Sequence, residues 1–238
     1  MIIVSLQNVT KNFRSSKIIK AISLEFKKGH ITCLLGSSGS GKTTLLRLIA
    51  GLEKADRGEI LINKKLASKG SDIIIPPSKR EIGFIFQDLA LWPHLSVYEN
   101  IALGLELKKS KNTKEKILEI LDFFGIPEQQ NKYPDQLSGG QQQLVAIARS
   151  LVLEPKVLLM DEPLANLDVK LKTKIRNKIK ELRDKFSLSI IYVTHDHHEA
   201  FLLADEIVVI HDGKVEAIGT PDEIRSSENK YVEEFIEI

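Results

Sequence analysis

Three short segments of this 238-residue chain carry residues that could bind phosphate or activate water. The first segment fits the pattern G-x-x-x-x-G-K-[ST]. It consists of Gly36, Ser37, Ser38, Gly39, Ser40, Gly41, Lys42 and Thr43. Glycines let successive backbone N–H groups turn inward around an anion, and a following helix adds its N-terminal N–H groups. Lys42 then supplies a positive charge for the β- and γ-phosphates of a nucleotide, and the Thr43 hydroxyl can bind Mg²⁺.

The second segment is a pair of carboxylates, Asp161 and Glu162, that follow the apolar run 157–160. Open parallel sheets bind ligands at the carboxyl ends of their strands. Asp161 suits the coordination shell of Mg²⁺, and Glu162 suits a general base that orients the attacking water. An isolated Asp-Glu pair is more often a solvated turn that ends a strand, but the phosphate loop in the same chain reverses that preference.

The third segment is the pentapeptide Leu137, Ser138, Gly139, Gly140, Gln141, at the start of a predicted helix. A serine followed by two glycines at a helix N-terminus is a second site for an anion. One nucleotide can use both anion sites only if they face each other. The simple arrangement is a head-to-tail dimer, in which the pentapeptide of each protomer closes the phosphate loop of the other.

The elements that must position these residues alternate along the chain. The apolar pattern predicts strands at 2–9, 18–26, 31–35, 59–62, 82–86, 157–160, 189–193, 206–210 and 214–218. It predicts helices at 43–51, 97–107, 113–124, 141–153, 169–185 and 197–204, and an amphipathic stretch after Thr220 and Pro221. Strands that alternate with helices indicate an α/β fold with a parallel sheet. The helical block at about 88–155 is predicted to be a lobe inserted into that sheet.

Composition narrows the class of partner. The formal net charge of +2 gives no electrostatic reason to expect nucleic acid. The single cysteine, Cys33, lies in an apolar run and is expected in the core, so no disulfide is predicted. No apolar run reaches the 18–20 residues or so that span a bilayer, and the N-terminus does not read as a signal peptide. We therefore expect a cytoplasmic protein that reaches a membrane only through a partner.

Together these motifs resemble the ATP-binding subunit of an ATP-binding-cassette (ABC) transporter over nearly the whole chain. The resemblance implies a P-loop NTPase with a RecA-like parallel-sheet core, an N-terminal antiparallel β subdomain and an inserted α-helical subdomain. It implies one domain over 1–238, with the α/β core at 1–87 and 156–238 and the lobe at 88–155. The cofactors that it implies are ATP and Mg²⁺.

The same resemblance assigns further site residues. Phe13 occupies the position of the aromatic ring that stacks on adenine, and Thr44 joins the nucleotide-binding loop. Gln87 corresponds to the residue that contacts Mg²⁺ and the attacking water, so the implied metal ligands are Thr43, Gln87 and Asp161. Asn166, Leu167 and Asp168 correspond to the loop that crosses the dimer interface, with Asp168 near the nucleotide. His195 corresponds to the histidine that contacts the γ-phosphate, which places it with Glu162, Gln87 and Lys42 in the catalytic set.

The segment 86–101 resembles importer ATPases of the sugar, polyamine, ferric-ion and oxyanion type. In those proteins this region receives a helix of the membrane permease, so Trp92 and Leu95 are either partner contacts or packing residues of the lobe. The implied partners are a second copy or a homologous ATPase subunit, permease subunits that bind at 88–101, and indirectly a solute-binding protein, without nucleic acid. The implied location is the inner face of the cell membrane.

Other readings of the motifs are an exporter, a soluble ABC ATPase of DNA repair or translation, and a P-loop kinase or GTPase. The segment 91–101 argues against the exporter. Soluble ABC ATPases carry a tandem cassette or a long coiled-coil insertion, and this sequence has neither. A kinase or GTPase leaves 137–141 unexplained. The chain departs from the family pattern at Leu144, usually arginine, and Ala165, usually serine. It also stops soon after Thr220, so the regulatory β domain of many such importers is expected to be absent.

Overall fold

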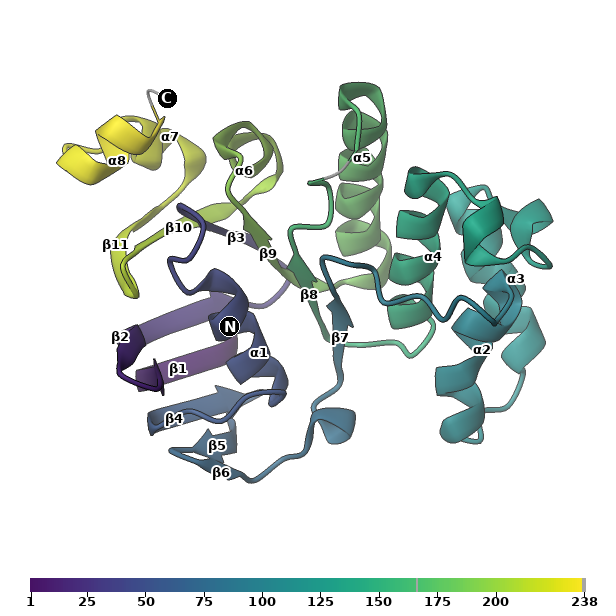
Figure 1. Cartoon of the computed structure of the whole chain (residues 1–238), viewed down its shortest axis with the longest axis horizontal. Coiled ribbons are helices and arrows are strands. Elements are labelled where there is room, and N and C mark those ends of the chain that lie inside the picture. The colour runs from purple at the N-terminus through teal and green to yellow at the C-terminus, as the bar shows by residue number, and fades with distance from the viewer. Residues whose placement is uncertain (166, 237–238) are drawn as a thin grey trace.

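A computed structural model describes residues 1–165 and 167–236, in two sheets and an end lobe of helices (Figure 1). Asn166, predicted to belong to the loop that crosses the dimer interface, lies outside the described residues. The first sheet is antiparallel, in the order β2-β1-β4-β5-β6. Its strands are β1 (Ile2–Phe13), β2 (Ser16–Lys27), β4 (Arg57–Ile62), β5 (Lys65–Lys69) and β6 (Asp72–Ile73).

The second sheet has the order β11-β10-β3-β9-β8-β7 and is parallel apart from its edge strand β11. Its strands are β3 (Ile31–Leu35), β7 (Ile82–Ile85), β8 (Val157–Asp161), β9 (Ser189–Thr194), β10 (Glu206–His211) and β11 (Lys214–Gly219). Every residue of β3, β8 and β9 is buried, because elements cover both faces of a parallel sheet.

The helices are α1 (Lys42–Ala50), α2 (Val97–Leu107), α3 (Thr113–Phe124), α4 (Gly139–Leu151), α5 (Val169–Phe186), α6 (His197–Leu203), α7 (Pro221–Arg225) and α8 (Lys230–Ile236). Short 3-10 turns lie at Pro77–Lys79, Pro127–Gln129 and Pro134–Gln136. No helix in the described ranges 1–165 and 167–236 is long and apolar enough to cross a membrane.

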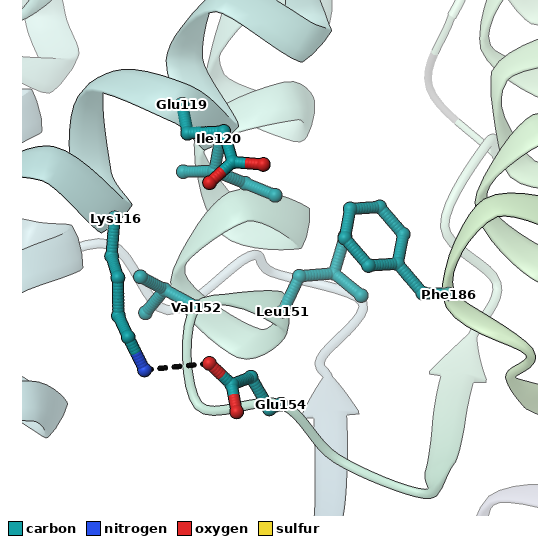
Figure 2. A pocket seen from close by; sticks show the side chains of 7 residues that line it. All are labelled: Lys116, Glu119, Ile120, Leu151, Val152, Glu154 and Phe186. Atoms are coloured by element: carbon teal, nitrogen blue, oxygen red, sulfur yellow. Dashed lines mark hydrogen bonds and ion pairs between the residues drawn. The ribbon is translucent and has the colours of Figure 1, made fainter.

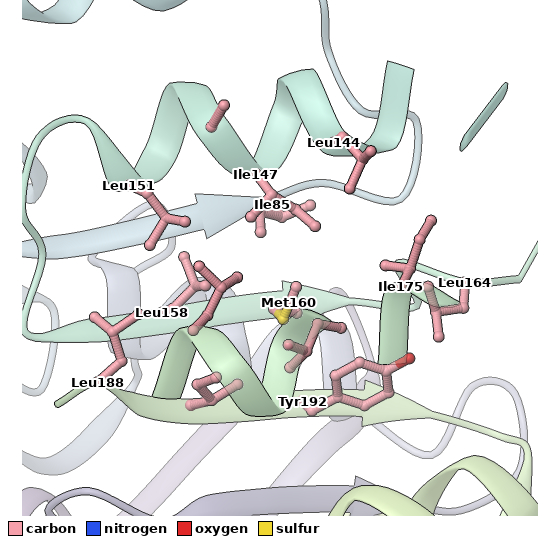
Figure 3. Close-up of a cluster of buried hydrophobic side chains, with 14 of the residues drawn as sticks. Ile85, Leu144, Ile147, Leu151, Leu158, Met160, Leu164, Ile175, Leu188 and Tyr192 are labelled. Carbon is pink, nitrogen blue, oxygen red and sulfur yellow. The ribbon is translucent and has the colours of Figure 1, made fainter. Parts of the chain in front are cut away.

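Alternate residues of each buried strand enter two different cores, as the pleat of a strand requires. Leu158 and Met160 of β8 face the core shared with α2 to α6, and Leu159 faces the core built on α1 and the antiparallel sheet. Figure 3 shows α4 placing Leu144 and Ile147 over β8 in the first core. The parallel sheet is thereby clamped between helices on one face and α1 on the other.

The predicted fold class is confirmed, and most predicted elements are present within one to four residues of the expected ends. Two details differ. Helix α4 begins at Gly139 rather than Gln141, because Ser138 caps it and the two glycines form its first turn. Strands β5 and β6 were not predicted, because they are short and rich in polar residues. The division of the chain at 88–155 stays a prediction, although α2, α3 and α4 do lie together at one end (Figure 1).

Candidate nucleotide-binding site

The glycine-rich loop joins buried β3 to α1 in a backbone path that side chains would block. Gly41 has a φ of 103°, and a Cβ atom there would lie 2.8 Å from Ile19 Cδ1 and 2.9 Å from the Ile18 carbonyl oxygen. At Gly36 a Cβ atom would lie 2.1 Å from the carbonyl oxygen of Ile210. The glycines therefore let the loop pass between β2 and β10 and begin α1 directly after Gly41.

Lys42 lies across the mouth of this loop. Its ammonium group donates hydrogen bonds to the carbonyl oxygens of Gly36 and Ser37, both at 2.8 Å, and to Ser40 Oγ at 3.3 Å. The residue is only 4% exposed. Burial lowers the pKa of Lys42, while the carboxylates of Glu162 and Asp161 oppose that shift. The glycine-rich loop thus holds a buried cation at the N-terminus of α1, and a cation with free backbone N–H groups is the arrangement that binds phosphate.

Thr43 and Asp161 meet beside Lys42. Thr43 Oγ1 donates to Asp161 Oδ1 at 2.8 Å, which joins the first turn of α1 to the end of β8. Burial raises the pKa of Asp161, the hydrogen bond from Thr43 lowers it, and the nearby charge of Glu162 raises it again. A hydroxyl and a carboxylate are hard oxygen ligands, so this pair fits Mg²⁺.

The donor set also matches how Mg²⁺ is usually held. Within 1–165 and 167–236 there is no group of three His, Cys, Asp or Glu side chains that could hold a metal alone. Mg²⁺ usually binds through one or two carboxylates together with substrate phosphates and water, rather than in a cage of protein ligands. A single buried carboxylate next to a phosphate loop is therefore the expected donor set for Mg²⁺ that arrives with a nucleotide.

Glu162 and His195 form a second pair on the adjacent strand ends. Glu162 Oε2 lies 3.1 Å from His195 Nδ1. The backbone N–H of Glu162 donates to the carbonyl oxygen of Val193 at 3.0 Å, and Glu162 has a left-handed φ of 45°. This conformation is uncommon in a residue with a side chain. It turns the chain sharply at the end of β8, where the pairing with β9 brings the Glu162 carboxylate to the imidazole.

Nine of the predicted site residues line one pocket of about 410 Å³. Its lining consists of Phe13, Ile18, Ser38, Gly39, Gly41, Lys42, Thr43, Thr44, Gln87 and Glu162. Five further predicted residues contact this lining. Lys42 hydrogen-bonds to Gly36, Ser37 and Ser40. Thr43 hydrogen-bonds to Asp161, and Glu162 lies beside His195. Segments from the antiparallel sheet, the loop and three strand ends therefore surround one hollow.

The aromatic edge of this pocket comes from β1. The Phe13 ring is 45% exposed, and Lys11 Nζ lies 4.8 Å from its centroid. Ile18 of β2 also lines the pocket, a contact that the sequence does not predict. The only sequence signal for Ile18 is its place in a strand, because its approach to Gly41 depends on how β2 crosses the loop.

The pentapeptide residues lie elsewhere. Ser138 accepts the N–H of Gln141 at 3.4 Å, and Gln141 Oε1 accepts the N–H of Ser138 at 3.0 Å, so the two residues cap α4. A Cβ atom at Gly140 would lie 2.4 Å from Leu171 Cδ2 of α5. Gly139 lines a separate hollow of about 240 Å³ that also touches Gln87 and Glu162.

Asp168 likewise does not line the 410 Å³ pocket. Its carboxylate accepts the N–H of Leu171 at 3.0 Å and caps α5. The structure thus brings together the first two chemical segments, and it leaves the pentapeptide and Asp168 outside the pocket of their own chain.

A buried polar network behind His195 was not predicted. Glu199 Oε2 accepts hydrogen bonds from the Tyr192 and Thr194 hydroxyls, both at 3.0 Å, and Glu199 Oε1 lies 2.9 Å from Lys172 Nζ. Burial and then the charge of Glu199 raise the pKa of Tyr192 well above its ordinary value, so its hydroxyl remains a donor. Thr194 Oγ1 also accepts the N–H of Asp196 at 3.0 Å, so the network fixes the chain on both sides of His195.

Another hollow lies between the end of α4 and α3, and it has a different character (Figure 2). It encloses about 70 Å³, and Ile120, Leu151, Val152 and Phe186 supply its apolar walls. Its charged groups include Lys116 and Glu154, which pair with each other at 2.6 Å. None of the predicted site residues lines it, so it is not the candidate site.

The chain is also similar in sequence to known proteins. The family model described as "ABC transporter" matches residues 19–165. The spermidine/putrescine import ATP-binding protein PotA of Acetivibrio thermocellus is 44% identical over 99% of this chain and 66% of its own length. The probable sulfate/thiosulfate import ATP-binding protein CysA of Chlorella vulgaris is 44% identical over 97% of both chains.

A solved structure is also similar. The dimeric post-hydrolysis state of the ATP-binding cassette MJ0796, bound to ADP and Pi, shares 34% identity with a TM-score of 0.82. The match covers 92% of this chain and 98% of that one. The chain spans between 61% and 66% of the length of several bacterial relatives. The phosphate loop, the carboxylates and the pentapeptide all lie in one such fold. Because the family model matches more than half of the chain, the chain belongs to the ABC transporter family.

Proposed function

We propose that this protein hydrolyses ATP and that it is the energy-coupling subunit of an ABC transporter that imports a solute. The observation that carries the proposal is the Glu162 carboxylate, which lines the phosphate-loop pocket and lies 3.1 Å from the His195 imidazole. A phosphate cradle alone only binds a nucleotide. A carboxylate and a histidine beside that cradle are the groups needed to orient and deprotonate water.

The pocket lining suggests how ATP binds. The exposed Phe13 ring at the pocket edge stacks on adenine, an interaction worth about 1–3 kcal/mol that selects little between bases. Backbone N–H groups of 36–44 and the N-terminus of α1 bind the phosphate oxygens. Lys42 exchanges its loop carbonyl contacts for the β- and γ-phosphates and neutralises their charge.

Thr43, Asp161 and Gln87 would hold Mg²⁺, which, when bound with ATP, neutralises charge on the phosphate oxygens. Glu162 accepts a proton from the attacking water, whose oxygen forms a bond to the γ-phosphorus. The bond from that phosphorus to the oxygen bridging the β- and γ-phosphates breaks, and the products are ADP and inorganic phosphate. His195, held by the Glu199 network, donates a hydrogen bond to the γ-phosphate.

We further propose a head-to-tail dimer in which Ser138, Gly139, Gly140, Gln141 and Asp168 of one protomer close the site of the other. Support comes from the exposed start of α4, which lies outside the pocket of its own chain. The MJ0796 cassette, which is dimeric with ADP and Pi bound, is a related precedent for a dimer. The partner would be a second copy or a homologous ATPase subunit.

The import assignment rests on the relatives, whose names describe import of spermidine/putrescine, of Fe(3+) ions and of sulfate/thiosulfate. The permease would bind at 88–101, where Trp92 is 48% exposed and Leu95 is partly buried. The protein would then lie in the cytoplasm at the inner face of the membrane, and a solute-binding protein would deliver the cargo from the other side.

Phosphate release by the purified protein tests the hydrolysis claim. Wild type should release phosphate from ATP with Mg²⁺, and Glu162→Gln should lower kcat at least about 100-fold, because it removes the general base. Glu154→Gln is the matched control, since Glu154 is an exposed carboxylate outside the pocket. The proposal fails if wild type releases no phosphate, and the base assignment fails if Glu162→Gln hydrolyses ATP as fast as the control.

A further inference from the structure

The loop that follows Gln87 contains two strained residues. Leu89 and Ala90 have left-handed φ angles of 59° and 46°. This conformation costs roughly 1–2 kcal/mol for a residue that carries a Cβ atom, and consecutive cases are therefore uncommon. Such backbone persists only where surrounding groups hold it in place. The question is which group holds this loop, because its position sets where Gln87 points.

Arg149 of α4 holds both strained residues. One terminal guanidinium nitrogen, Nη2, donates to the Leu89 carbonyl oxygen at 2.7 Å, and the other, Nη1, donates to the Ala90 carbonyl oxygen at 2.5 Å. Burial lowers the pKa of Arg149 and the charge of Asp88 raises it, and an arginine keeps its charge through such shifts. Hydrogen bonds from a charged, planar donor are stronger and more directional than neutral ones.

The far side of the same loop is fixed by another helix of the end lobe. Asn100 of α2 accepts the N–H of Trp92 at 2.9 Å and donates to the carbonyl oxygens of Trp92, Leu95 and Ser96. The segment 89–96 is therefore tied to α4 at its beginning and to α2 at its end. Gln87 lies where this lobe-bound segment leaves the parallel sheet.

Helix α4 connects this loop with the pentapeptide. The helix begins at Gly139 and carries Arg149 ten residues later, which is about 15 Å along its axis. Ser150 adds a link to the sheet, because its hydroxyl donates to the Phe84 carbonyl oxygen of β7 at 3.2 Å. A displacement at the start of α4 can therefore reach both β7 and the loop through hydrogen bonds of a single rigid element.

We propose that Arg149 is a positioning residue that fixes the Gln87 loop to α4, so that movement of the pentapeptide end is passed to Gln87. The inference rests on the proposed function, in which Gln87 acts at the nucleotide site. Arg149 itself does not line the nucleotide pocket, so it acts through the loop rather than on ATP.

The kinetic test compares Arg149→Met, Gln87→Ala and the double variant with wild type, by kcat and KM for ATP. Arg149→Met should lower kcat on the order of 10-fold or more, because Gln87 is no longer held in its position. KM should change little, because Arg149 does not contact ATP. The double variant should be no slower than the slower single variant. Arg149→Lys should restore part of kcat, and Arg225→Met, at an exposed arginine, should behave as wild type.

A second readout does not depend on hydrolysis. Trp92 is the only tryptophan, and it lies two residues after Ala90. Its fluorescence anisotropy in nucleotide-free protein should fall in Arg149→Met and stay unchanged in Arg225→Met, while urea unfolding checks that both variants are folded. Unchanged anisotropy, wild-type kcat, or losses that multiply in the double variant would overturn the inference. Absence of hydrolysis by wild type would instead overturn the proposed function, and the anisotropy comparison would still decide the role of Arg149.

Discussion

At the residue scale, Asp161 shows how a residue of the candidate site affects the stability of the nucleotide-free protein. Its carboxylate is 3% exposed at the end of β8, with the Thr43 hydroxyl as hydrogen-bond donor and the like charge of Glu162 nearby. Burial and the charge of Glu162 raise the pKa of Asp161 above its unfolded value, against the hydrogen bond from Thr43, which lowers it. Stability from that shift is present below the unfolded pKa and is lost as the pH rises through the folded pKa. Above the folded pKa the ionised carboxylate therefore lowers the free energy of unfolding.

We therefore expect Asp161→Asn to raise the free energy of unfolding of the nucleotide-free protein, by an amount that grows as the pH rises. The amide keeps an acceptor for Thr43 but carries no charge. Urea unfolding between about pH 4 and pH 8, without Mg²⁺, measures this. Asp122→Asn, at an exposed residue of α3, is the matched control. A variant that is less stable than wild type at neutral pH would show that the charge of Asp161 is already compensated.

At the scale of elements, the Glu199 network joins α5, α6 and β9 behind His195. Lys172 reaches it from α5, Tyr192 and Thr194 from β9, and Glu199 itself stands in α6 with 4% exposure. Buried polar groups depend on their partners, so loss of this one acceptor leaves the Tyr192 and Thr194 hydroxyls without it, and Lys172 keeps only the more distant Asp196 at 3.7 Å. The network holds the strand end from which His195 faces Glu162.

Glu199→Leu should accordingly lower the free energy of unfolding by about 3 kcal/mol, because a buried donor without an acceptor costs 1–3 kcal/mol. Equilibrium unfolding in urea gives the value. Glu181→Leu serves for comparison, because Glu181 forms an exposed ion pair within α5, a kind worth at most about 1 kcal/mol. Equal losses in the two variants would mean that the network contributes no more than a surface ion pair.

Elements were predictable where their signal is local in sequence. Glycines and apolar spacing among neighbouring residues predict the phosphate loop and the helix from Lys42 to Ala50. They also predict the end of that helix at Gly51, which has a φ of 76°. Three contacts were not predictable from the sequence. They are the contact of Ile18 with the pocket, the ion pair of Glu199 with Lys172, and the hydrogen bond from Arg149 to Leu89. Each of these contacts joins segments that are brought together only by the packing of the sheets and the lobe.

At the scale of the whole molecule, the fold separates the two helix starts that we propose as anion sites. Helix α1 opens onto the 410 Å³ pocket, and the Ser138 start of α4 lies outside that pocket. The antiparallel sheet supplies Phe13 at one side of the pocket, and the helical lobe carries the pentapeptide at the start of α4, beside a separate hollow (Figure 1). A second copy related head to tail would bring the two starts onto one nucleotide, and ATP would then link the protomers.

The most direct test of the ATP-linked head-to-tail dimer is the mass of Glu162→Gln in solution, measured by light scattering with and without ATP. The variant should bind ATP without turning it over, so the nucleotide should hold two protomers together at twice the mass of one chain. Glu162→Gln combined with Ser138→Arg should bind ATP and remain at the mass of one chain, because the added side chain blocks the second anion site. A Glu162→Gln protein that is saturated with ATP and stays at the mass of a single chain would contradict the account.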